Sequence, residues 1–457
     1  MSQPLADRIA EYAVNLRFDQ LSPEVVHEVK RRVLDSLGCA FGAWHDEPGV
    51  VARRVASALS AERGSTLIGT AHRAPGDWAA FANGTIVRYL DYNDTYLSKE
   101  PAHPSDNIPA AMAIAESVGA SGRELITAIA LAYEIQCRLC DAVSLRAIGW
   151  DHVTYGCFSV AAAAGLLMKL DATKIRHALG IAGVTSAALR QTRVGELSHW
   201  KGCAFANAAR HGVYAAMLAA AGMTGPSPIF EGEKGFEKLV SREAIKLAGP
   251  IVGERDELMI LRTSIKCWPV EYHAQSAVEA AVALRQQLGD PSQIESVLIE
   301  SHDAAVDIIG SEPEKWRPKS RETADHSLPY ITAAALYDGD VTLATFSAKR
   351  IADAKLIDFV QKVKVVRHNE LSAMYPGAVG NIVTVKLRDG RTLTKRVDHA
   401  CGHAKNRMSD GQVRAKFHRL ADPVIGAQRA NGIVTWVEKL DVAPRIDELF
   451  PLLAVSS

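Results

Sequence analysis

The sequence has no excess of charge of either sign. It contains 52 Lys and Arg residues and 52 Asp and Glu residues, so its formal net charge at pH 7 is zero. A chain without a global positive field has no bulk attraction to nucleic acid or to an anionic membrane surface. We therefore predict neither kind of partner, and an anionic ligand would need a local basic pocket.

Several well-known motifs are missing. The chain has no GxGxxG opening a βαβ unit, no Walker A sequence, no HExxH and no GxSxG. Nucleotide-binding, zinc-peptidase and serine-hydrolase functions therefore lack their usual signatures. The longest weakly polar stretch, residues 212–223, is too short to span a bilayer. The N-terminus carries an early acid and no apolar segment of the signal-peptide type, so we expect a cytoplasmic protein.

Cysteine is scarce, with seven residues in 457. They are odd in number, scattered and mostly in apolar surroundings, as expected for reduced core thiols. Cys137 and Cys140 form a CxxC pair within a helical pattern, with no second pair nearby. Small buried residues are favoured there over metal or redox use. We predict no metal site.

Helix signals dominate the first 270 residues. Ser22 before Pro23 is typical of a helix start, and Ser121-x-x-Glu124 predicts a capping box that opens a helix over 125–143. Thr173 is predicted to cap another helix. A further helix is expected over 204–221, ending near Gly222. These helices are rich in Ala and Gly and apolar on more than one face, which indicates a thick helical bundle.

The pattern changes after about residue 270. Strands are predicted over 294–301 and 362–367, and a hairpin over 382–397 turns at Asp389-Gly390. Helices are expected over 273–288 and, despite Pro329, over 323–336, and the chain is helical again from about 412. The predicted fold is mainly α with an inserted α+β domain. Residues 1–268 and 405–457 would form the helical domain, and residues 269–404 the smaller α+β domain.

One polar segment stands out between two apolar, Ala-rich helices. LDYNDT at 90–95 and HPSDN at 103–107 bring acid, hydroxyl, amide and imidazole groups together. A buried carboxylate or imidazole is costly unless it is paired or hydrogen-bonded, so the cluster suggests a pocket wall. A polar interhelix loop with caps explains the bare pattern equally well.

Two further positions combine reactive groups with helix starts. His152, in GWDH at 149–152, precedes a predicted helix, where an uncharged imidazole suits a base. Lys201, in HWKG at 199–202, opposes the dipole of the helix it begins, which suits gripping a carboxylate. A lone histidine is more often structural than catalytic, so the argument depends on the joint occurrence of these groups.

The motifs taken together resemble the MmgE/PrpD family, which contains 2-methylcitrate dehydratase, cis-aconitate decarboxylase and an iminodisuccinate epimerase. The resemblance implies a helical domain with an inserted α+β lid, homodimers, and no metal or organic cofactor. It is carried, in order along the chain, by LDYNDTY at 90–96, HPSDN at 103–107, GWDH at 149–152, HWKG at 199–202, SIKCWPVEYHAQSAVEA at 264–280, DHSLPY at 325–330 and GHAKNR at 402–407.

The resemblance also implies which residues line the pocket. Two histidines, His103 and His152, would transfer protons, and two lysines would hold substrate carboxylates. The resemblance leaves open which histidine is the base, and the predicted helix-start position of His152 favours it as the base, with His103 as the acid. The catalytic residues would be Asp91, His103, His152, Lys201 and Lys266, and the substrate-binding residues Thr95, His273 and Tyr330.

The expected activity is that of a hydro-lyase that dehydrates a tricarboxylate, most readily 2-methylcitrate to 2-methyl-cis-aconitate. Decarboxylation of cis-aconitate or epimerisation next to a carboxylate stays open, as does a non-catalytic dicarboxylate-binding role. The chain departs from the best-known methylcitrate dehydratases at Tyr96, where they carry Trp, and at Pro101-Ala102, where they carry Trp-Gly. These departures concern the substrate more than the reaction class.

Overall fold

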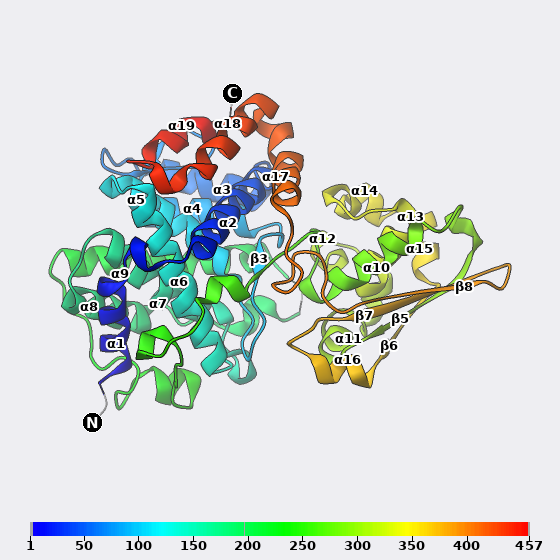
Figure 1. The fold of residues 1–457 in the computed structure, drawn as a ribbon, viewed down its shortest axis with the longest axis horizontal. Helices are drawn as coiled ribbons and strands as arrows, with labels where there is room; N and C mark the ends of the chain where they lie inside the picture. The colour runs from blue at the N-terminus through cyan, green and yellow to red at the C-terminus, as the bar shows by residue number, and fades with distance from the viewer. Residues whose placement is uncertain (1–2, 196, 456–457) are drawn as a thin grey trace. The chain divides into compact units, whose positions relative to one another are not determined.

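The structure, a computed structural model, describes residues 3–195 and 197–455 and divides them into two compact units (Figure 1). Unit 1 combines the chain up to Thr263 with the chain from Ser409 onward, and unit 2 comprises Ser264–Met408. The sequence placed these two divisions at 268/269 and 404/405.

Unit 1 is built almost entirely from helices, apart from three two-residue strands. The sequence did not predict the antiparallel pair β1 and β2. The elements of unit 1 are α1 (Leu5–Asn15), α2 (Pro23–Gly42), α3 (Glu47–Ser57), β1 (Ser65–Thr66), β2 (Arg73–Ala74), α4 (Gly76–Arg88), β3 (Asp94–Thr95), α5 (Ile108–Val118), α6 (Gly122–Ala142), α7 (Gly156–Leu167), α8 (Ala172–Thr185), α9 (Trp200–Ala220), α17 (Asp410–Ile425), α18 (Ala427–Glu438) and α19 (Phe450–Leu453).

Local capping signals fixed most of the predicted helix starts. The Ser22 side chain accepts from the backbone N–H of Val25 at the start of α2, and Ser121 with Glu124 forms the predicted capping box of α6. The prediction for Thr173 is wrong. The side chain of Asp171 caps α8, because it stands one residue before the helix, while Thr173 lies inside the first turn.

The helix expected over 204–221 is α9, which begins four residues earlier, at Trp200, and ends at Ala220. Gly222 follows with a φ of 100°, a conformation that favours glycine.

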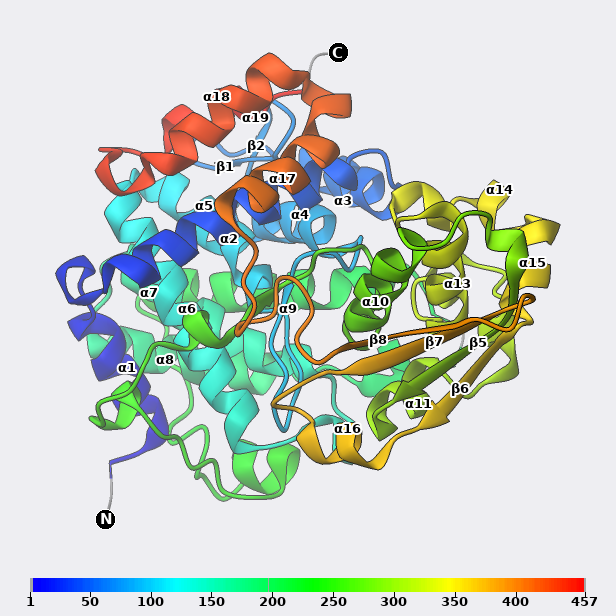
Figure 2. The same cartoon turned by 45° about the vertical axis from the view of Figure 1, so that its right-hand side comes forward.

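The last helices of the chain return to the first ones within unit 1. Figures 1 and 2 show α17, in orange, beside α2, in blue, and the two helices pack together. The Nζ of Lys416 on α17 lies 2.6 Å from a carboxylate oxygen of Asp35 on α2, and both side chains are fully buried. The same ammonium donates to the carbonyl oxygen of Tyr92 and lies over its ring. Helix α17 therefore supports the turn that carries the predicted site residues.

Unit 2 contains a four-stranded mixed sheet with the order β6-β5-β7-β8. Strand β5 is parallel to β6 and antiparallel to β7, and β7 forms the predicted hairpin with β8. The elements of unit 2 are β4 (Ser264–Ile265), α10 (Gln275–Arg285), β5 (Ile294–Ser301), α11 (Asp303–Ile309), α12 (Arg321–Ala324), α13 (Leu328–Asp338), α14 (Ala348–Ile351), α15 (Ala354–Val360), β6 (Val363–Arg367), α16 (Asn369–Met374), β7 (Asn381–Leu387) and β8 (Thr392–Val397).

Alternation along the strands gives unit 2 a core of its own. On β7, Val383 and Val385 are buried and pair with the buried Ile299 and Val297 of β5. Helices α10 and α13 lie along this face of the sheet (Figure 2). Buried and more exposed residues therefore alternate along β7, as expected for a strand of a sheet that is covered on one face.

The single helix predicted over 323–336 is two helices. Helix α12 ends at Ala324 and α13 begins at Leu328, with the Ser327 side chain as its cap. Pro329 stands in the first turn of α13, where its missing N–H has no intrahelical partner to lose. The proline therefore marks a helix start and not the interior of one.

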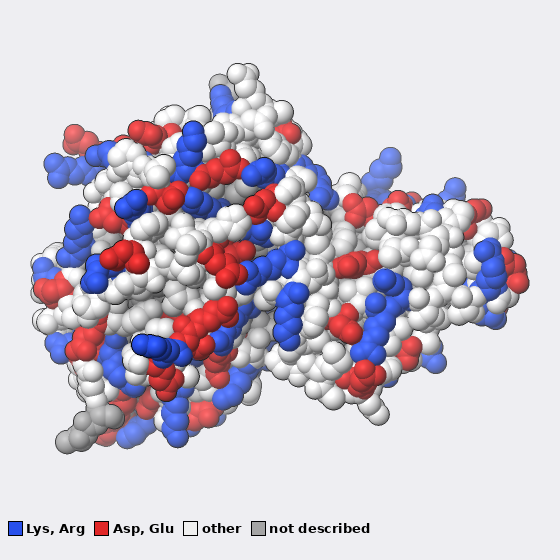
Figure 3. Space-filling view, in the orientation of Figure 1, with Lys and Arg blue, Asp and Glu red and all other residues white. Residues whose placement is uncertain are grey.

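The surface charges are mixed. On the face shown in Figure 3, Lys and Arg alternate with Asp and Glu over both units, in agreement with the zero formal net charge. Within residues 3–195 and 197–455, no helix is both long and apolar enough to cross a membrane.

Candidate active site

The predicted site residues are divided between the two units. Asp91, Thr95, His103, His152 and Lys201 belong to unit 1, and Lys266, His273 and Tyr330 to unit 2. Each set is described within its own unit.

Asp91 is the centre of the unit 1 cluster. One carboxylate oxygen lies 2.7 Å from Nη1 of Arg88 and 3.8 Å from Nε2 of His103, and the other lies 3.4 Å from Nζ of Lys201. All four side chains are buried or nearly so. Asp91 has a φ of 52°, which is uncommon for a residue with a side chain and costs of order 1–3 kcal/mol. Strain of this kind persists where the surroundings hold a functional side chain in place.

The hydrogen bond made by His103 fixes which of its ring nitrogens faces the cluster. Nδ1 lies 2.7 Å from the backbone oxygen of Asp94. A carbonyl oxygen can only accept, so Nδ1 carries the proton, and Nε2 is the acceptor in the neutral ring. Nε2 is the nitrogen that lies near Asp91.

His152 has the same arrangement, with a carboxylate in place of the carbonyl. It opens the short 3-10 turn His152–Tyr155 that leads into α7, as its predicted helix-start position required. Nδ1 lies 3.0 Å from Oδ1 of Asp151. Nε2 is buried and has no hydrogen-bond partner among the described residues. The rings of His103 and His152 are 6.0 Å apart, centre to centre.

Asp151 stays ionised although it is fully buried. Burial raises its pKa, but His152 and Arg193 together hold that pKa well below its ordinary value. Nε of Arg193 lies 3.0 Å from Oδ2 and 3.3 Å from Oδ1 of Asp151. Because an ionised carboxylate can only accept, the proton of a neutral His152 lies on Nδ1 and its lone pair on Nε2.

Lys201 lies in the first turn of α9, close to the positive end of the helix dipole. The predicted conflict with the dipole is therefore present, and the carboxylate of Asp91 offsets it. Nη1 of Arg193 lies 3.4 Å from the backbone oxygen of Lys201. The arginine that binds Asp151 therefore also contacts the first turn of α9.

The other acids of the 90–107 segment build its framework. Asp94 accepts from the Tyr133 hydroxyl at 2.7 Å and from the backbone N–H of Ser105 at 2.9 Å. Asp106 accepts from the side-chain amide of Asn93, and burial raises the pKa of this carboxyl to about 7. The polar-loop interpretation therefore describes these groups, while the pocket-wall interpretation stays a prediction for Asp91 and His103.

Thr95 contacts the same framework through its side chain. Its hydroxyl donates to the backbone oxygen of Ala102 at 3.3 Å. Its predicted role in substrate binding stays a prediction.

In unit 2, His273 repeats the arrangement of the unit 1 histidines. Its Nδ1 lies 2.6 Å from Oε1 of Glu271, whose other oxygen accepts from the His273 backbone N–H. Burial raises the pKa of Glu271, but His273, with further contributions from His326 and Lys266, brings it to about 2. The nitrogen left over, Nε2, lies 3.5 Å from the hydroxyl of Tyr375.

Aromatic rings surround His273. Tyr375 stacks on His302 with ring centres 4.8 Å apart and an interplanar angle of 16°, and His302 lies 5.1 Å from His273. Both ring nitrogens of His302 are buried and have no hydrogen-bond partner among the described residues. Burial, with a smaller contribution from His273, lowers the pKa of His302 to about 3. His302 is therefore neutral over the whole physiological range.

The other two predicted residues of unit 2 are both buried but differ in character. The Lys266 ammonium belongs to the charged surroundings of Glu271. Tyr330 packs against Phe346 in the core of unit 2, and its hydroxyl donates to the backbone oxygen of Thr345. These contacts favour a packing role for Tyr330, and binding of substrate by this residue stays a prediction.

Sequence reasoning missed the groups that hold the histidines. Asp151 and Glu271 stand one and two residues before His152 and His273, so an acid just ahead of each histidine was a readable signal. No comparable signal marked Arg88 or Arg193 in the sequence, because only the tertiary fold brings their partners close to them. His302 directly follows β5 and Tyr375 directly follows α16. No sequence pattern marked either residue as part of a site.

The cysteines and the possible metal ligands give no further site. Cys137 and Cys140 are buried, and burial raises the pKa of both thiols well above the usual value. In the described part of the chain, no three His, Cys, Asp or Glu side chains are grouped so that they could hold a metal ion.

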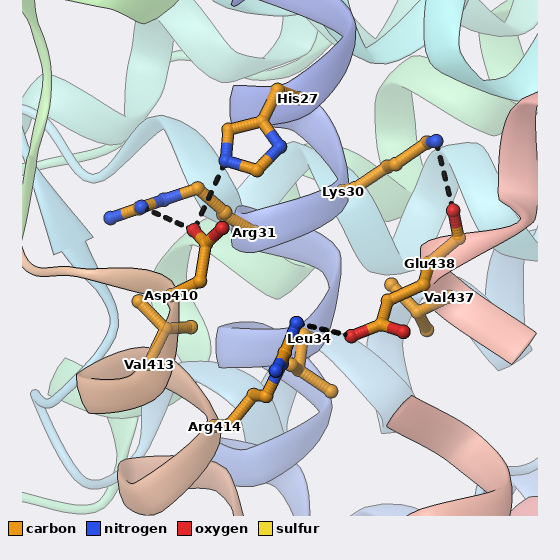
Figure 4. A pocket seen from close by; sticks show the side chains of 9 residues that line it. All are labelled: His27, Lys30, Arg31, Leu34, Asp410, Val413, Arg414, Val437 and Glu438. Atoms are coloured by element: carbon orange, nitrogen blue, oxygen red, sulfur yellow. Dashed lines mark hydrogen bonds and ion pairs between the residues drawn. The ribbon is translucent and has the colours of Figure 1, made fainter. Parts of the chain in front are cut away.

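A pocket of about 110 Å³ lies elsewhere in unit 1, between α2, α17 and α18 (Figure 4). Its charged groups form ion pairs, and that of Lys30 is with Asp441, which lies outside the residues that line the pocket. Asp410 binds both His27 and Arg31, and Arg414 lies 2.6 Å from Glu438. None of the predicted site residues lines this pocket, and its charged side chains are already engaged in ion pairs.

Comparison with known families covers most of the chain. The MmgE/PrpD N-terminal domain matches residues 7–247, and the MmgE/PrpD C-terminal domain matches residues 268–441.

Characterised relatives align over nearly their whole length. Cis-aconitate decarboxylase from Mus musculus is 26% identical over 459 residues, which cover 96% of this chain and 91% of the relative. The 2-methylcitrate dehydratase of Escherichia coli (strain K12) is 27% identical over 87% of this chain and 86% of its own. The 2-methylcitrate dehydratase of Cupriavidus necator is 28% identical over 89% and 87%.

Proposed function

The chain belongs to the MmgE/PrpD family, and we propose that it is a lyase that removes a proton next to a carboxylate of a small polycarboxylate. The reaction we favour is dehydration of a tricarboxylate, with 2-methylcitrate converted to 2-methyl-cis-aconitate. The relatives named 2-methylcitrate dehydratase support this choice, and those named cis-aconitate decarboxylase support the same broader class.

The observation that carries the proposal is the paired arrangement of His103 and His152. Each ring is held through Nδ1 by an oxygen that cannot donate, and each can therefore offer Nε2 for proton transfer. The Nε2 of His152 is buried without a partner among the described residues, as expected for a base that awaits its substrate. Lys201 and Arg88 add positive charge beside them.

The proposed reaction is the elimination of water. His152 Nε2 takes the proton from the carbon next to a carboxylate, and the electrons of the broken C–H bond form the new C=C bond. The C–O bond on the adjacent carbon breaks, and the departing hydroxyl takes a proton from His103 Nε2 to leave as water. Asp91, 3.8 Å from that nitrogen, suits a protonated His103.

The substrate carboxylates need cations as charge develops on them. Lys201, beside Asp91 in unit 1, is the proposed group, and a well-placed donor contributes roughly 3–4 kcal/mol to such a transition state. The same role for Lys266 in unit 2 stays a prediction.

Incubation with 2-methylcitrate tests the proposal. Formation of the conjugated product gives ultraviolet absorbance, and we expect it to rise in proportion to enzyme concentration. A folded protein that produces no absorbance between pH 6 and 9, while 2-methylcitrate stays unchanged by mass spectrometry, would refute the dehydratase assignment.

Decarboxylation of cis-aconitate is the second candidate. The mouse decarboxylase aligns over 96% of this chain, against 87% for the Escherichia coli dehydratase, at nearly equal identity. The chain also departs from the methylcitrate dehydratases at Tyr96 and Ala102, which pair through two backbone hydrogen bonds directly before His103. Release of carbon dioxide from cis-aconitate without dehydration of 2-methylcitrate would select this reaction. Deuterium uptake from solvent without either product would select epimerisation, and binding of a dicarboxylate without turnover a non-catalytic role.

We also propose that the protein is a homodimer. Helix α9 exposes large apolar side chains, with Trp200, Tyr214 and Met217 between 38% and 51% exposed, and such groups favour a partner surface. Light scattering after gel filtration should give twice the chain mass of 49.3 kDa.

A further inference from the structure

Arg193 lies behind His152 and touches it only through Asp151. Its Nε is 3.0 Å from Oδ2 of Asp151, while His152 Nδ1 is 3.0 Å from Oδ1. The arginine side chain is 13% exposed and the aspartate fully buried. Oδ1 of Asp151 is therefore shared by the histidine and the guanidinium, whereas Oδ2 lies nearest the guanidinium.

The backbone completes this arrangement. The N–H of Val153 donates to Oδ1 of Asp151 at 3.3 Å, and Arg193 reaches the backbone oxygen of Lys201 with its Nη1. One guanidinium therefore fixes the carboxylate behind the proposed base and contacts the turn that bears the proposed carboxylate-binding lysine. Arg88 and Arg190 add positive charge near Asp151, and the ring of His103 lies 6.0 Å from that of His152.

We propose that Arg193 is a positioning residue that acts through Asp151 to keep the proton of neutral His152 on Nδ1, so that Nε2 offers its lone pair to the substrate. Without the guanidinium, Oδ2 of Asp151 is a buried charged oxygen short of a partner, and the carboxylate turns away from Nδ1 to find one. The inference deepens the proposed function and rests on it for the role of Nε2. The placement of the proton does not depend on which reaction is catalysed.

The first test is made on the full-length, substrate-free protein. Nitrogen-15 NMR of labelled histidines distinguishes a ring protonated at Nδ1 from one protonated at Nε2, and the signal lost in His152→Gln identifies His152. We expect Nδ1–H in the wild type. In Asp151→Asn the amide N–H can point at Nδ1, which must then accept, so the proton moves to Nε2. In Arg193→Gln we expect a mixture of both forms in which Nε2–H predominates.

The second test separates positioning from general structural support. A tautomer error lowers turnover without weakening ground-state binding, so Arg193→Gln should lower kcat about 10- to 100-fold with KM within twofold. The Asp151→Asn substitution should lower kcat at least a hundredfold. In the serine-protease triad, Asp→Asn at the corresponding position costs about 10⁴ through the wrong tautomer.

Two further variants complete the comparison. Arg193→Lys keeps the charge near Oδ2 and should restore the Nδ1–H form and most of kcat. Arg176→Gln removes an arginine paired with Asp7 at 3.4 Å, on α8 and α1, and should change neither tautomer nor kinetics.

The outcomes distinguish the inference from the proposed function. An unchanged Nδ1–H signal in Arg193→Gln, or Nε2–H in the wild type, overturns the role of Arg193. If the tautomers respond as expected and no polycarboxylate is turned over, the positioning role of Arg193 is supported and the proposed function fails.

Discussion

At the residue scale, three histidines share one device. His103, His152 and His273 each bind an oxygen through Nδ1, and in each case that oxygen belongs to a carbonyl or to an acid placed to act as an acceptor. The device settles the tautomer before any substrate arrives, which is the pre-organisation that proton transfer requires.

The proposed proton transfers predict the effect of removing either unit 1 histidine. His103→Ala and His152→Ala should each leave the fold intact and lower turnover at least a hundredfold, in line with acid–base contributions of roughly 10²–10⁴. His199→Ala is the matched control, because that side chain is 53% exposed and directly precedes the helix that carries Lys201. Steady-state kinetics and circular dichroism check the three variants. Wild-type turnover in either of the first two would remove that histidine from the mechanism.

Two tyrosines of unit 2 allow a similar comparison. Tyr330→Phe removes the hydroxyl that satisfies the Thr345 carbonyl, so it should lower the free energy of unfolding by about 1–2 kcal/mol and leave kcat and KM unchanged. Tyr375→Phe removes a hydroxyl 3.5 Å from Nε2 of His273 and should raise KM with little loss of stability. Chemical denaturation and kinetics measure both effects. If KM rises in Tyr330→Phe and not in Tyr375→Phe, Tyr330 takes part in substrate binding.

At the element scale, the junction of β5 and α11 carries a titratable group, His302, whose two ring nitrogens are buried without a hydrogen-bond partner among the described residues. His302 directly precedes α11 and is fully buried, and burial lowers its pKa from the ordinary value of 6.5 to about 3. As pH falls through 6.5, the unfolded chain takes up a proton at this residue and the folded chain does not. Stability is therefore lost between pH 6.5 and pH 3.

This linkage predicts an acid-sensitive unit 2. Between pH 8 and pH 5, the His302 contribution should lower the free energy of unfolding by about 2 kcal/mol. His302→Phe keeps a ring for stacking on Tyr375 and should remove that part of the pH dependence, while substitution of the exposed His45 by Phe should not. Urea unfolding at the two pH values measures the difference. Equal pH dependence in wild type and His302→Phe would show that the buried ring is not responsible.

Elements and contacts differed in how far the sequence could predict them. Capping residues such as Ser22 and Ser121 act over three or four positions, so local pattern located α2 and α6. Thr173 failed because Asp171, two residues earlier, competed for the same role. The candidate histidines came from motifs within the chain. Arg193 and its contact with Asp151 join residues 42 positions apart, and no local pattern encodes such a pair.

At the scale of the whole molecule, the two units depend on the chain in different ways. Unit 2 is continuous and has its own sheet and apolar core, whereas unit 1 needs two separate segments. The second segment supplies α17, whose Lys416 neutralises the fully buried Asp35 and supports the backbone at Tyr92, next to Asp91. Removing one member of a buried ion pair typically costs about 3–5 kcal/mol.

This asymmetry predicts the behaviour of fragments. Residues 264–408 expressed alone should give a cooperative thermal transition by circular dichroism, because their sheet and helices already enclose a core. A chain that ends at residue 408 should lack the cooperative transition of unit 1, and Lys416→Met in the full chain should weaken the same transition without unfolding unit 2. Native mass spectrometry and hydrogen exchange of the unit 2 amides serve as controls that show whether unit 2 stays folded in each variant. A fragment 264–408 without protected amides would contradict the prediction, since its core would then need support from outside the fragment.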